Sequence, residues 1–222
     1  GGRLKHFREV VRAETPEQAV RLRKAGGDKA LYIAGGTMVV PLAARTVEVL
    51  VDIGWLDLAG AAVKDSQVTI GALTRLADLL SPQLKLALPI VFDAARQCAT
   101  PLIRNMATLG GALVVAHLPS DIMVALLAHG ARLEMLREKE TSVNIEDLLA
   151  QGWLRGHDLI LRVVVEKPEA GTGSHFAKFG RSAIDIALVN VAASLHLAKG
   201  GKVCGLILAV GQSYSLPILL TD

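Results

Sequence analysis

The start of the chain contains a helix whose two ends are marked by local sequence signals. In the stretch TPEQAVRLRKAGG, Thr15 can cap the helix, the proline after it suits the first turn, and Gln18 completes a Thr-x-x-Gln capping box. The glycine pair at the end of the stretch stops the helix. Short buried strands are predicted next, at 30–34 and 47–53. A helix and strands in so short a segment predict a compact α/β lobe over residues 1–56.

The rest of the chain has a different pattern, in which short strands are separated by turn signals and occasional helices. This pattern is typical of an antiparallel sheet with helices to one side, so residues 57–222 are predicted to form a second lobe of α+β class. Helices are predicted at 74–80, 90–99 and 120–130, and strands at 67–73, 131–136, 159–168, 174–181, 186–198 and 204–210.

The composition excludes several classes of function. The formal net charge of the 222 residues is only +3 and basic residues are not interleaved with aromatic ones, so we expect no nucleic-acid binding. No apolar stretch reaches the roughly 18 residues of a membrane span, and no signal peptide is recognisable. We therefore expect a cytoplasmic protein without a membrane span.

The chain has two cysteines, Cys98 and Cys204, and neither lies in a CxxC or Cys/His pattern. Such spacing provides no ligand set for an iron–sulfur cluster or a structural zinc, so we expect no metal site. Two thiols in a chain of this length fit a reducing compartment, and both are expected to be inert packing residues.

Two glycine pairs, each close to a threonine, are the main sign of a ligand site. They occur in AGGTMVVP, at 34–41, and in RNMATLGGAL, at 104–113. Glycine allows positive φ and close backbone approach, so successive N–H groups can converge on an anion, and two such loops would suit a diphosphate. Ordinary tight turns have the same appearance, and neither loop matches G-x-G-x-x-G or the P-loop. The residues alone leave both interpretations open.

Several longer segments occur in an order that resembles a known family. They are AGGTMVVPL, VLVDI, IGALTRLADLL, AARQCATPLIRNMATLGGAL, PSDIMVALLAHGARLEM and KFGRSAIDIALVNVAASL, and together they cover nearly the whole chain. The combination resembles the FAD-binding medium subunit of the molybdenum hydroxylases, such as carbon monoxide dehydrogenase and xanthine dehydrogenase. The resemblance implies a two-lobed FAD-binding fold of the vanillyl-alcohol oxidase type. The two glycine loops, one from each lobe, would then hold the pyrophosphate of one FAD.

The resemblance also implies a set of cofactor-binding residues and two departures from the family pattern. Met38 and Ala112 stand where the family usually has a polar residue, and each would lose a hydrogen bond contributing about 1 kcal/mol. The implied set is Ile33, Ala34, Gly35, Gly36, Thr37 and Met38 from the first loop, Thr108, Leu109, Gly110, Gly111 and Ala112 from the second, and Arg104, Asp121, Ile160 and Lys178.

Residues outside the glycine pairs each have a functional and a structural interpretation. By resemblance Asp121 would reach the ribose hydroxyls, but it could also cap the helix that begins there. Lys178 would lie near the flavin ring, or be a solvated strand lysine. Arg104 would serve the pyrophosphate or pin its loop, and Ile160 would pack on the ring. His117 is expected to be a hydrogen-bonded loop residue rather than an acid or base.

The resemblance implies a subunit of an oxidoreductase without a catalytic residue of its own. No nucleophile pattern is found, and this agrees with chemistry supplied by non-covalently bound FAD. Electrons would arrive from a [2Fe–2S] small subunit and leave to NAD⁺, a quinone or oxygen, while the substrate is oxidised at a molybdenum cofactor in a large subunit. The family pattern continues into a further C-terminal domain that is expected to be missing here. Two alternatives remain: another flavin reductase of the same superfamily, or a non-catalytic assembly subunit with a decayed FAD site.

Overall fold

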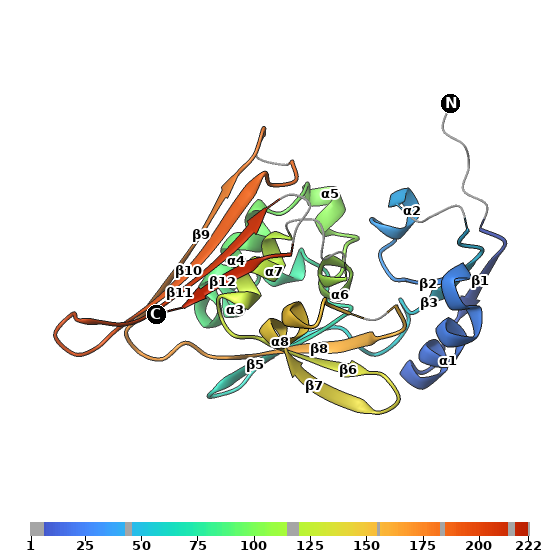
Figure 1. Cartoon of the computed structure of the whole chain (residues 1–222), viewed down its shortest axis with the longest axis horizontal. Helices are drawn as coiled ribbons and strands as arrows, with labels where there is room; N and C mark the ends of the chain where they lie inside the picture. Colours follow the sequence, from blue (N-terminus) through green and yellow to red (C-terminus); the bar gives the residue numbers. More distant parts are fainter. Residues whose placement is uncertain are drawn as a thin grey trace.

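The computed structural model describes residues 7–42, 46–114, 120–154, 156–182, 185–212 and 216–221. Strands in this part of the chain form three sheets, and the helices lie mostly between the second and the third (Figure 1). The chain is therefore of α+β class, as the sequence predicts. No helix in the described ranges is long and apolar enough to cross a membrane.

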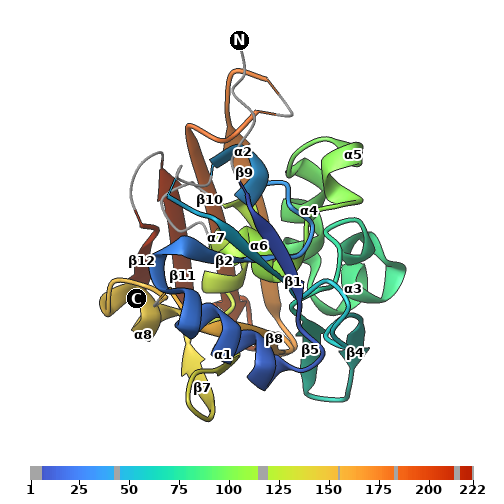
Figure 2. The ribbon, with the colours of Figure 1, turned by 90° about the vertical axis from the view of Figure 1, so that its right-hand side faces the viewer.

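The first sheet is small and parallel, and helix α1 packs beside it. Its order is β1 (Glu9–Arg12), β3 (Val49–Asp52), β2 (Ala30–Ile33), and it faces the viewer with α1 (Pro16–Gly26) in Figure 2. The Thr15 side chain accepts a hydrogen bond from the Gln18 N–H at 3.2 Å, as expected for the cap. The Gln18 amide oxygen accepts from the N–H of Glu14, one residue earlier than in a capping box. The strands predicted at 30–34 and 47–53 are confirmed.

The second sheet has β8 at its centre and is antiparallel throughout. Its order is β4 (Ala61–Val63), β5 (Gln67–Gly71), β8 (Leu159–Glu166), β6 (Arg132–Leu136), β7 (Glu140–Asn144). Strand β8 reads LILRVVVE and is buried along almost its whole length, because both of its faces are covered. Short helices connect this part of the fold: α3 (Pro82–Ala87), α5 (Pro101–Arg104), α6 (Leu109–Leu113) and α8 (Ile145–Ala150). Helix α2 (Val39–Leu42) lies between β2 and β3 of the first sheet.

The third sheet contains the last strands of the chain. It is antiparallel in the order β12 (Ile218–Thr221), β11 (Val203–Gln212), β10 (Val189–Leu197), β9 (Thr172–Phe179). Helices α4 (Pro89–Gln97) and α7 (Asp121–Leu127) separate it from the second sheet (Figure 1). All residues of α7 are buried, as is typical of a helix that is apolar around its whole circumference. The main hydrophobic core therefore surrounds α7.

The segment 74–80 differs from its prediction. Only Asp78–Leu80 is helical, as a single 3₁₀ turn. Leu76 and Ala77 instead donate their N–H groups to the carbonyls of Ala107 and Arg104, at 2.9 and 3.0 Å. Backbone bonds to a distant segment override the local helical pattern here. The sequence prediction also missed β7, α8 and β12.

The two cysteines differ in their environment. Cys98 is half-buried and packs against the main core, as expected, whereas Cys204 is exposed on β11 and is not a packing residue. Burial raises the pKa of the Cys98 thiol to about 11. Since the thiolate is the reactive form, Cys98 is a poor nucleophile near neutral pH.

We predict that iodoacetamide at pH 8 modifies one cysteine rapidly in the native protein and both after denaturation. Peptide mass spectrometry should place the rapid modification at Cys204. Rapid modification of Cys98 in the native protein would contradict the burial of its thiol.

His129, just after α7, makes stability depend on pH. Burial lowers its pKa to about 4, and its Nε2 atom has no hydrogen-bond partner among the described residues. Between pH 6.5 and 4 the histidine is protonated in the unfolded chain but neutral in the native state. The free energy of unfolding therefore decreases as the pH falls from about 6.5 towards 4.

We predict that lowering the pH from 7 to 5 costs the wild type about 1–2 kcal/mol more unfolding free energy than it costs His129→Gln. The glutamine is similar in size and does not titrate, so the other groups contribute equally to both proteins. Urea unfolding at the two pH values measures the difference. Equal losses in the two proteins would mean that His129 is solvated in the native state.

Candidate functional site

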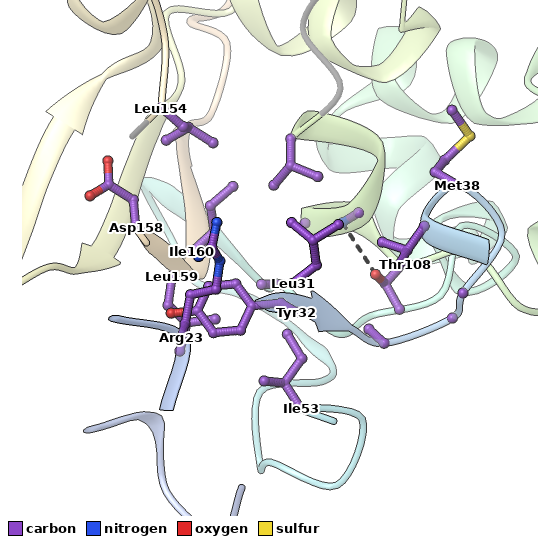
Figure 3. Close-up of a pocket in the computed structure, with 18 of the residues that line it drawn as sticks. Arg23, Leu31, Tyr32, Met38, Ile53, Thr108, Leu154, Asp158, Leu159 and Ile160 are labelled. Carbon is purple, nitrogen blue, oxygen red and sulfur yellow. Dashed lines mark hydrogen bonds between the residues drawn. The ribbon is translucent and has the colours of Figure 1, made fainter. Parts of the chain in front are cut away.

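The two glycine loops lie on opposite walls of one cleft. The cleft has a volume of about 660 Å³ and lies between the first sheet and the region around α6 and β8 (Figure 3). The loop after β2 forms one wall and the start of α6 forms the other. The predicted residues that line the cleft are Ala34, Gly35, Gly36, Thr37, Met38, Thr108, Gly110, Gly111 and Ile160.

The first loop needs glycine at both positions of its pair, for different reasons. A Cβ on Gly35 would lie 1.9 Å from the carbonyl oxygen of Met106, so the two backbones could not come together with any side chain there. Gly36 has a φ of +69°, in the left-handed region that other residues rarely adopt. In the described part of the chain, no protein oxygen accepts a hydrogen bond from the N–H of Gly36, Thr37 or Met38. These donors are available to a ligand.

The second loop differs from the sequence expectation of a second nest of unused N–H groups. Leu109 donates to the carbonyl of Thr74 and Gly110 to that of Ala72, both at 2.8 Å. The Gly111 N–H donates to the Thr108 hydroxyl at 3.2 Å, because Thr108 caps α6. Gly111 is helical, so it needs no left-handed φ. This loop is a hydrogen-bonded wall, and its glycines leave the wall without side chains. A Cβ on Gly110 would lie only 3.1 Å from Ala72.

The cleft holds few charges, and sequence analysis did not identify them. Its ionisable lining side chains include Arg23, Asp28 and Asp158, with Tyr32 beside them. Asp158 pairs with Arg137 at 3.2 Å, and the Arg23 guanidinium donates to the Gly27 carbonyl. An anion near the glycine loops would therefore depend mainly on backbone N–H groups, as in other loop-based anion sites.

The end of the cleft around Tyr32 has mostly aliphatic side chains, with the Arg23 side chain beside Tyr32. Leu31, Ile53, Leu159 and Ile160 line it, and the side chains converge around Tyr32 in Figure 3. The Tyr32 hydroxyl donates to the carbonyl of His157 at 3.0 Å, and burial raises the pKa of this phenol. A planar aromatic ligand can be buried against such a surface. Apart from Ile160, sequence analysis gave no reason to choose these residues, because aliphatic side chains in strands normally indicate core.

Several of the implied residues lie outside this cleft. Leu109 is fully buried in the main core, and Ala112 is partly buried against it. Ile33 ends β2, where its carbonyl accepts from the N–H of Ile53 at 2.9 Å. The missing polar group at position 112 therefore does not bear on the cleft described above, whereas Met38 does line it.

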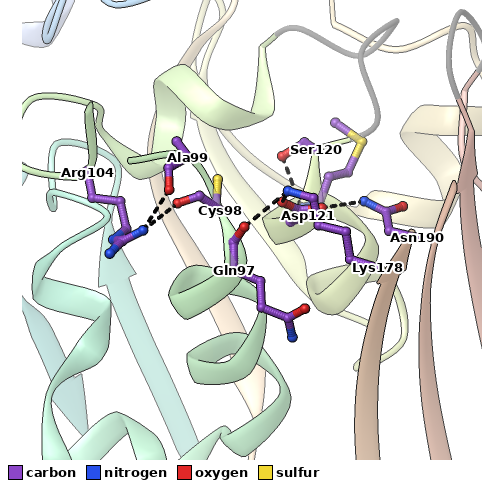
Figure 4. Close-up of polar contacts among 9 residues, drawn as sticks. Gln97, Cys98, Ala99, Arg104, Ser120, Asp121, Lys178 and Asn190 are labelled. Atoms are coloured by element: carbon purple, nitrogen blue, oxygen red, sulfur yellow. Dashed lines mark hydrogen bonds and ion pairs between the residues drawn. The ribbon is translucent and has the colours of Figure 1, made fainter. Parts of the chain in front are cut away.

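Asp121 and Lys178 contact each other in a buried polar cluster (Figure 4). Their charged atoms are 2.9 Å apart, and both side chains are about 5% exposed. Lys178 also donates to the carbonyl of Gln97 at 3.0 Å, and Asn190 donates to Asp121 at 2.7 Å. Burial raises the pKa of Asp121, while the hydrogen bonds from Asn190 and Lys178 oppose the shift. Lys178 is therefore not a solvated lysine.

Asp121 does not cap the helix, and Arg104 has a structural role. Ser120, not Asp121, caps α7 by accepting from the Met123 N–H at 3.3 Å. Arg104 donates to the carbonyls of Cys98 and Ala99 at 2.9 and 2.8 Å, and so pins the turn before α5 rather than the glycine loop itself. Lys178 and Arg104 line a second cleft of about 480 Å³. His117 lies outside the described residues.

The first cleft fits FAD in size and in chemistry. A volume of about 660 Å³ lies within the usual range for ligand sites. Unused N–H groups on the first loop suit a pyrophosphate, and the apolar end suits a ring system. The fold and the cleft together define a ligand-binding protein of α+β class.

Comparisons with known proteins identify the family. Residues 5–167 match the family described as the FAD binding domain in molybdopterin dehydrogenase. The chain is 35% identical over 203 residues to the 6-hydroxypseudooxynicotine dehydrogenase complex subunit alpha of Paenarthrobacter nicotinovorans, covering 87% of this chain and 69% of the relative. It is 31% identical over 215 residues to the carbon monoxide dehydrogenase medium chain of Hydrogenophaga pseudoflava, covering 83% and 75%.

A solved structure shows the same fold. The carbon monoxide dehydrogenase of Hydrogenophaga pseudoflava that lacks the Mo-pyranopterin moiety superimposes with a TM-score of 0.87 and 26% identity, over 96% of this chain and 77% of that one. This chain therefore belongs to the FAD-binding medium subunits of the molybdenum hydroxylases. It is an oxidoreductase component, and its cofactor is FAD.

We predict that Gly36→Val weakens FAD binding about 100-fold, equal to about 2.7 kcal/mol. The valine would strain a left-handed residue and hinder approach to the N–H groups of the first loop. Gly130→Val is the matched control, because Gly130 has a φ of +61° and lies outside the cleft. Its stability should fall similarly, with FAD affinity unchanged. Equilibrium titration of FAD into apo-protein gives the affinities, and equal affinities in all three proteins would exclude this loop as the site.

Proposed function

We propose that this chain passes electrons through non-covalently bound FAD, from a [2Fe–2S] small subunit to an external acceptor. NAD⁺, a quinone or oxygen could serve as the acceptor. The substrate would be oxidised at a molybdenum cofactor in a large subunit. The observation that carries the proposal is the single cleft lined by both glycine loops, in a chain of this family. The names of relatives as medium chains or as a subunit of a dehydrogenase complex support the assembly.

We propose that the first loop holds the pyrophosphate through the N–H groups of Gly36, Thr37 and Met38. The wall formed by Thr108, Gly110 and Gly111 would orient the cofactor mainly by shape, since the N–H groups of both glycines already have protein acceptors. Ile160 would pack on an aromatic part of the cofactor. When bound, FAD supplies the capacity to exchange both single electrons and electron pairs.

The remaining predicted residues would act around the cofactor rather than in catalysis. In this proposal the Asp121 carboxylate neutralises the positive charge of Lys178, so the pair adds little net charge to its side of the site. In this proposal the chain divides into two lobes, residues 1–56 and 57–222, and the cofactor binds between them. The first sheet and α1 fall in the first segment, and the other sheets fall in the second.

We predict that the chain, tagged and recovered from its native cell, co-purifies with subunits that contain iron and molybdenum. The chain expressed alone should contain FAD, released by acid precipitation, but neither metal. Elemental analysis and the flavin spectrum are the measurements. Flavin that stays attached to the precipitated chain would contradict non-covalent binding, and a solitary chain able to oxidise hydroxylase substrates would contradict the division of labour.

The electron route can be tested separately in the same complex. Gly36→Val should leave the iron and molybdenum content unchanged but strongly lower the FAD content. Dithionite-reduced complex of this variant should then transfer electrons to NAD⁺ or a quinone at less than about one tenth of the wild-type rate. The Gly130→Val complex is the control and should retain the wild-type rate. Equal rates in all three complexes would exclude FAD from the route.

A further inference from the structure

Arg23 lies on the buried face of α1, at a position where an apolar side chain is usual. The buried residues of this helix are Ala19, Val20 and Arg23, and their spacing forms one stripe along it. The first two belong to the smaller hydrophobic core, and Arg23 is only 7% exposed. Because an arginine stays charged in proteins, the helix buries a cation where a leucine would be the ordinary choice.

Other charges that this chain buries are paired with an opposite charge. Lys178 lies 2.9 Å from Asp121, and Asp158 lies 3.2 Å from Arg137. In the part of the chain that the structure describes, no acidic side chain forms an ion pair with Arg23, although acidic residues line the same cleft. A buried cation without a counter-ion is costly, so position 23 needs an explanation other than stability.

The guanidinium of Arg23 also keeps donors that the protein does not use. Among the described residues, only its Nη1 finds an acceptor, the carbonyl of Gly27 just after α1, and Nε has none. Nη2 lies beside Gly156, where a Cβ would be 3.1 Å from it, so the glycine leaves space next to the guanidinium. Arg23 and Gly156 both line the first cleft. The unused donors therefore adjoin the space that a ligand would fill.

Arg23 lies at the end of the first cleft that is farthest from the glycine loops. In Figure 3 it is beside Tyr32, whereas Met38 and Thr108 lie towards the other end. Helix α1 packs against β2 and β8 here and closes this end. The lining residues of the closed end are at most 8% exposed, namely Ile53, Asp158, Leu159 and Ile160. A group bound at the closed end would be shielded from solvent and from other proteins.

FAD has two ring systems, and only one of them suits the closed end. With the pyrophosphate on the first loop, one ring would extend towards Arg23 and the other away from it. A flavin that exchanges electrons with a partner subunit and an external acceptor needs an accessible edge, which the closed end does not offer. The adenine takes no part in electron transfer and can be buried completely. Its ring nitrogens accept hydrogen bonds, and a guanidinium can also stack on its face.

We propose that Arg23 is a specificity-determining residue of the cleft, whose guanidinium donates to an acceptor nitrogen of the FAD adenine. The inference rests on the proposed function, because the orientation of FAD follows from the electron route. A site with buried donors disfavours a ligand that leaves them unpaired. Arg23 would therefore favour FAD over FMN, which ends at its phosphate. In the apo-protein the buried cation is a cost, which the base would offset on binding.

Arg23→Leu tests this role, because leucine fits the buried stripe but has no donor. Titration of FAD into the apo-protein should give a dissociation constant about 10- to 100-fold higher than that of the wild type. Arg23→Gln keeps a shorter donor and should bind FAD more weakly than the wild type but more tightly than the leucine variant. It also provides the test if the leucine variant does not fold. Arg21→Leu, on the exposed side of the same helix, is the matched control and should bind FAD like the wild type.

Two further measurements separate this role from a structural one and from contact with the flavin. Urea unfolding of the apo-protein should find Arg23→Leu at least as stable as the wild type, since the variant removes an unpaired buried cation. A less stable variant with wild-type FAD affinity would make Arg23 a structural residue. The reduction potential of bound FAD should be the same in Arg23→Leu and the wild type. A changed potential would place the cation beside the flavin and overturn the assignment to adenine.

The outcomes for Arg23 and for the proposed function can be told apart. FAD affinity in Arg23→Leu equal to that of the wild type would overturn the role of Arg23, as would an equal loss of affinity in Arg21→Leu. Neither result concerns the electron route, which the Gly36→Val complex tests. Equal electron-transfer rates in that complex and the wild type would count against the proposed function, whatever the titrations show.

Discussion

The cleft depends on a backbone contact between segments that are far apart in sequence. The first glycine loop lies against the carbonyl of Met106, at a distance that excludes a Cβ at Gly35. This contact holds the first sheet next to the segment that leads into α6, and so places the two walls opposite each other. Any side chain at position 35 would have to push the walls apart. The identity of one residue thus fixes the width of the site.

Sequence reasoning predicted the elements whose signals are local. The cap at Thr15, the buried strands and the apolar helix that became α7 each follow from a short stretch of residues. It failed where distant hydrogen bonds decide the conformation, as at Leu76 and Ala77, whose N–H groups bond to the segment 104–107. The family resemblance placed both glycine loops at one site, and the structure places them in one cleft. It could not show that the N–H groups of Leu109 and Gly110 are already used within the protein, because this depends on which carbonyls fold against them.

The polar cluster around Asp121 shows a further limit of motif reasoning. Two residues considered separately as cofactor contacts form an ion pair, and Asn190, which no motif identified, completes it. Lys178 and Asn190 lie on neighbouring strands, paired in register, and both point towards the start of α7. The cluster therefore fastens the third sheet to the helix at the centre of the core. A buried pair of this kind is costly to break, because one charge would be left without a partner.

The hydrogen-bonded state of the second loop affects how the cleft meets any ligand. The N–H groups of Leu109, Gly110 and Gly111 donate to Thr74, Ala72 and Thr108, so this part of the wall is already ordered before a ligand arrives. Little conformational entropy is then lost on this side of the cleft when a ligand binds. A wall whose hydrogen bonds are already made is preorganised, so a ligand that settles against it does not have to order it. Binding free energy is then not spent on ordering this wall, and this favours retention of the ligand.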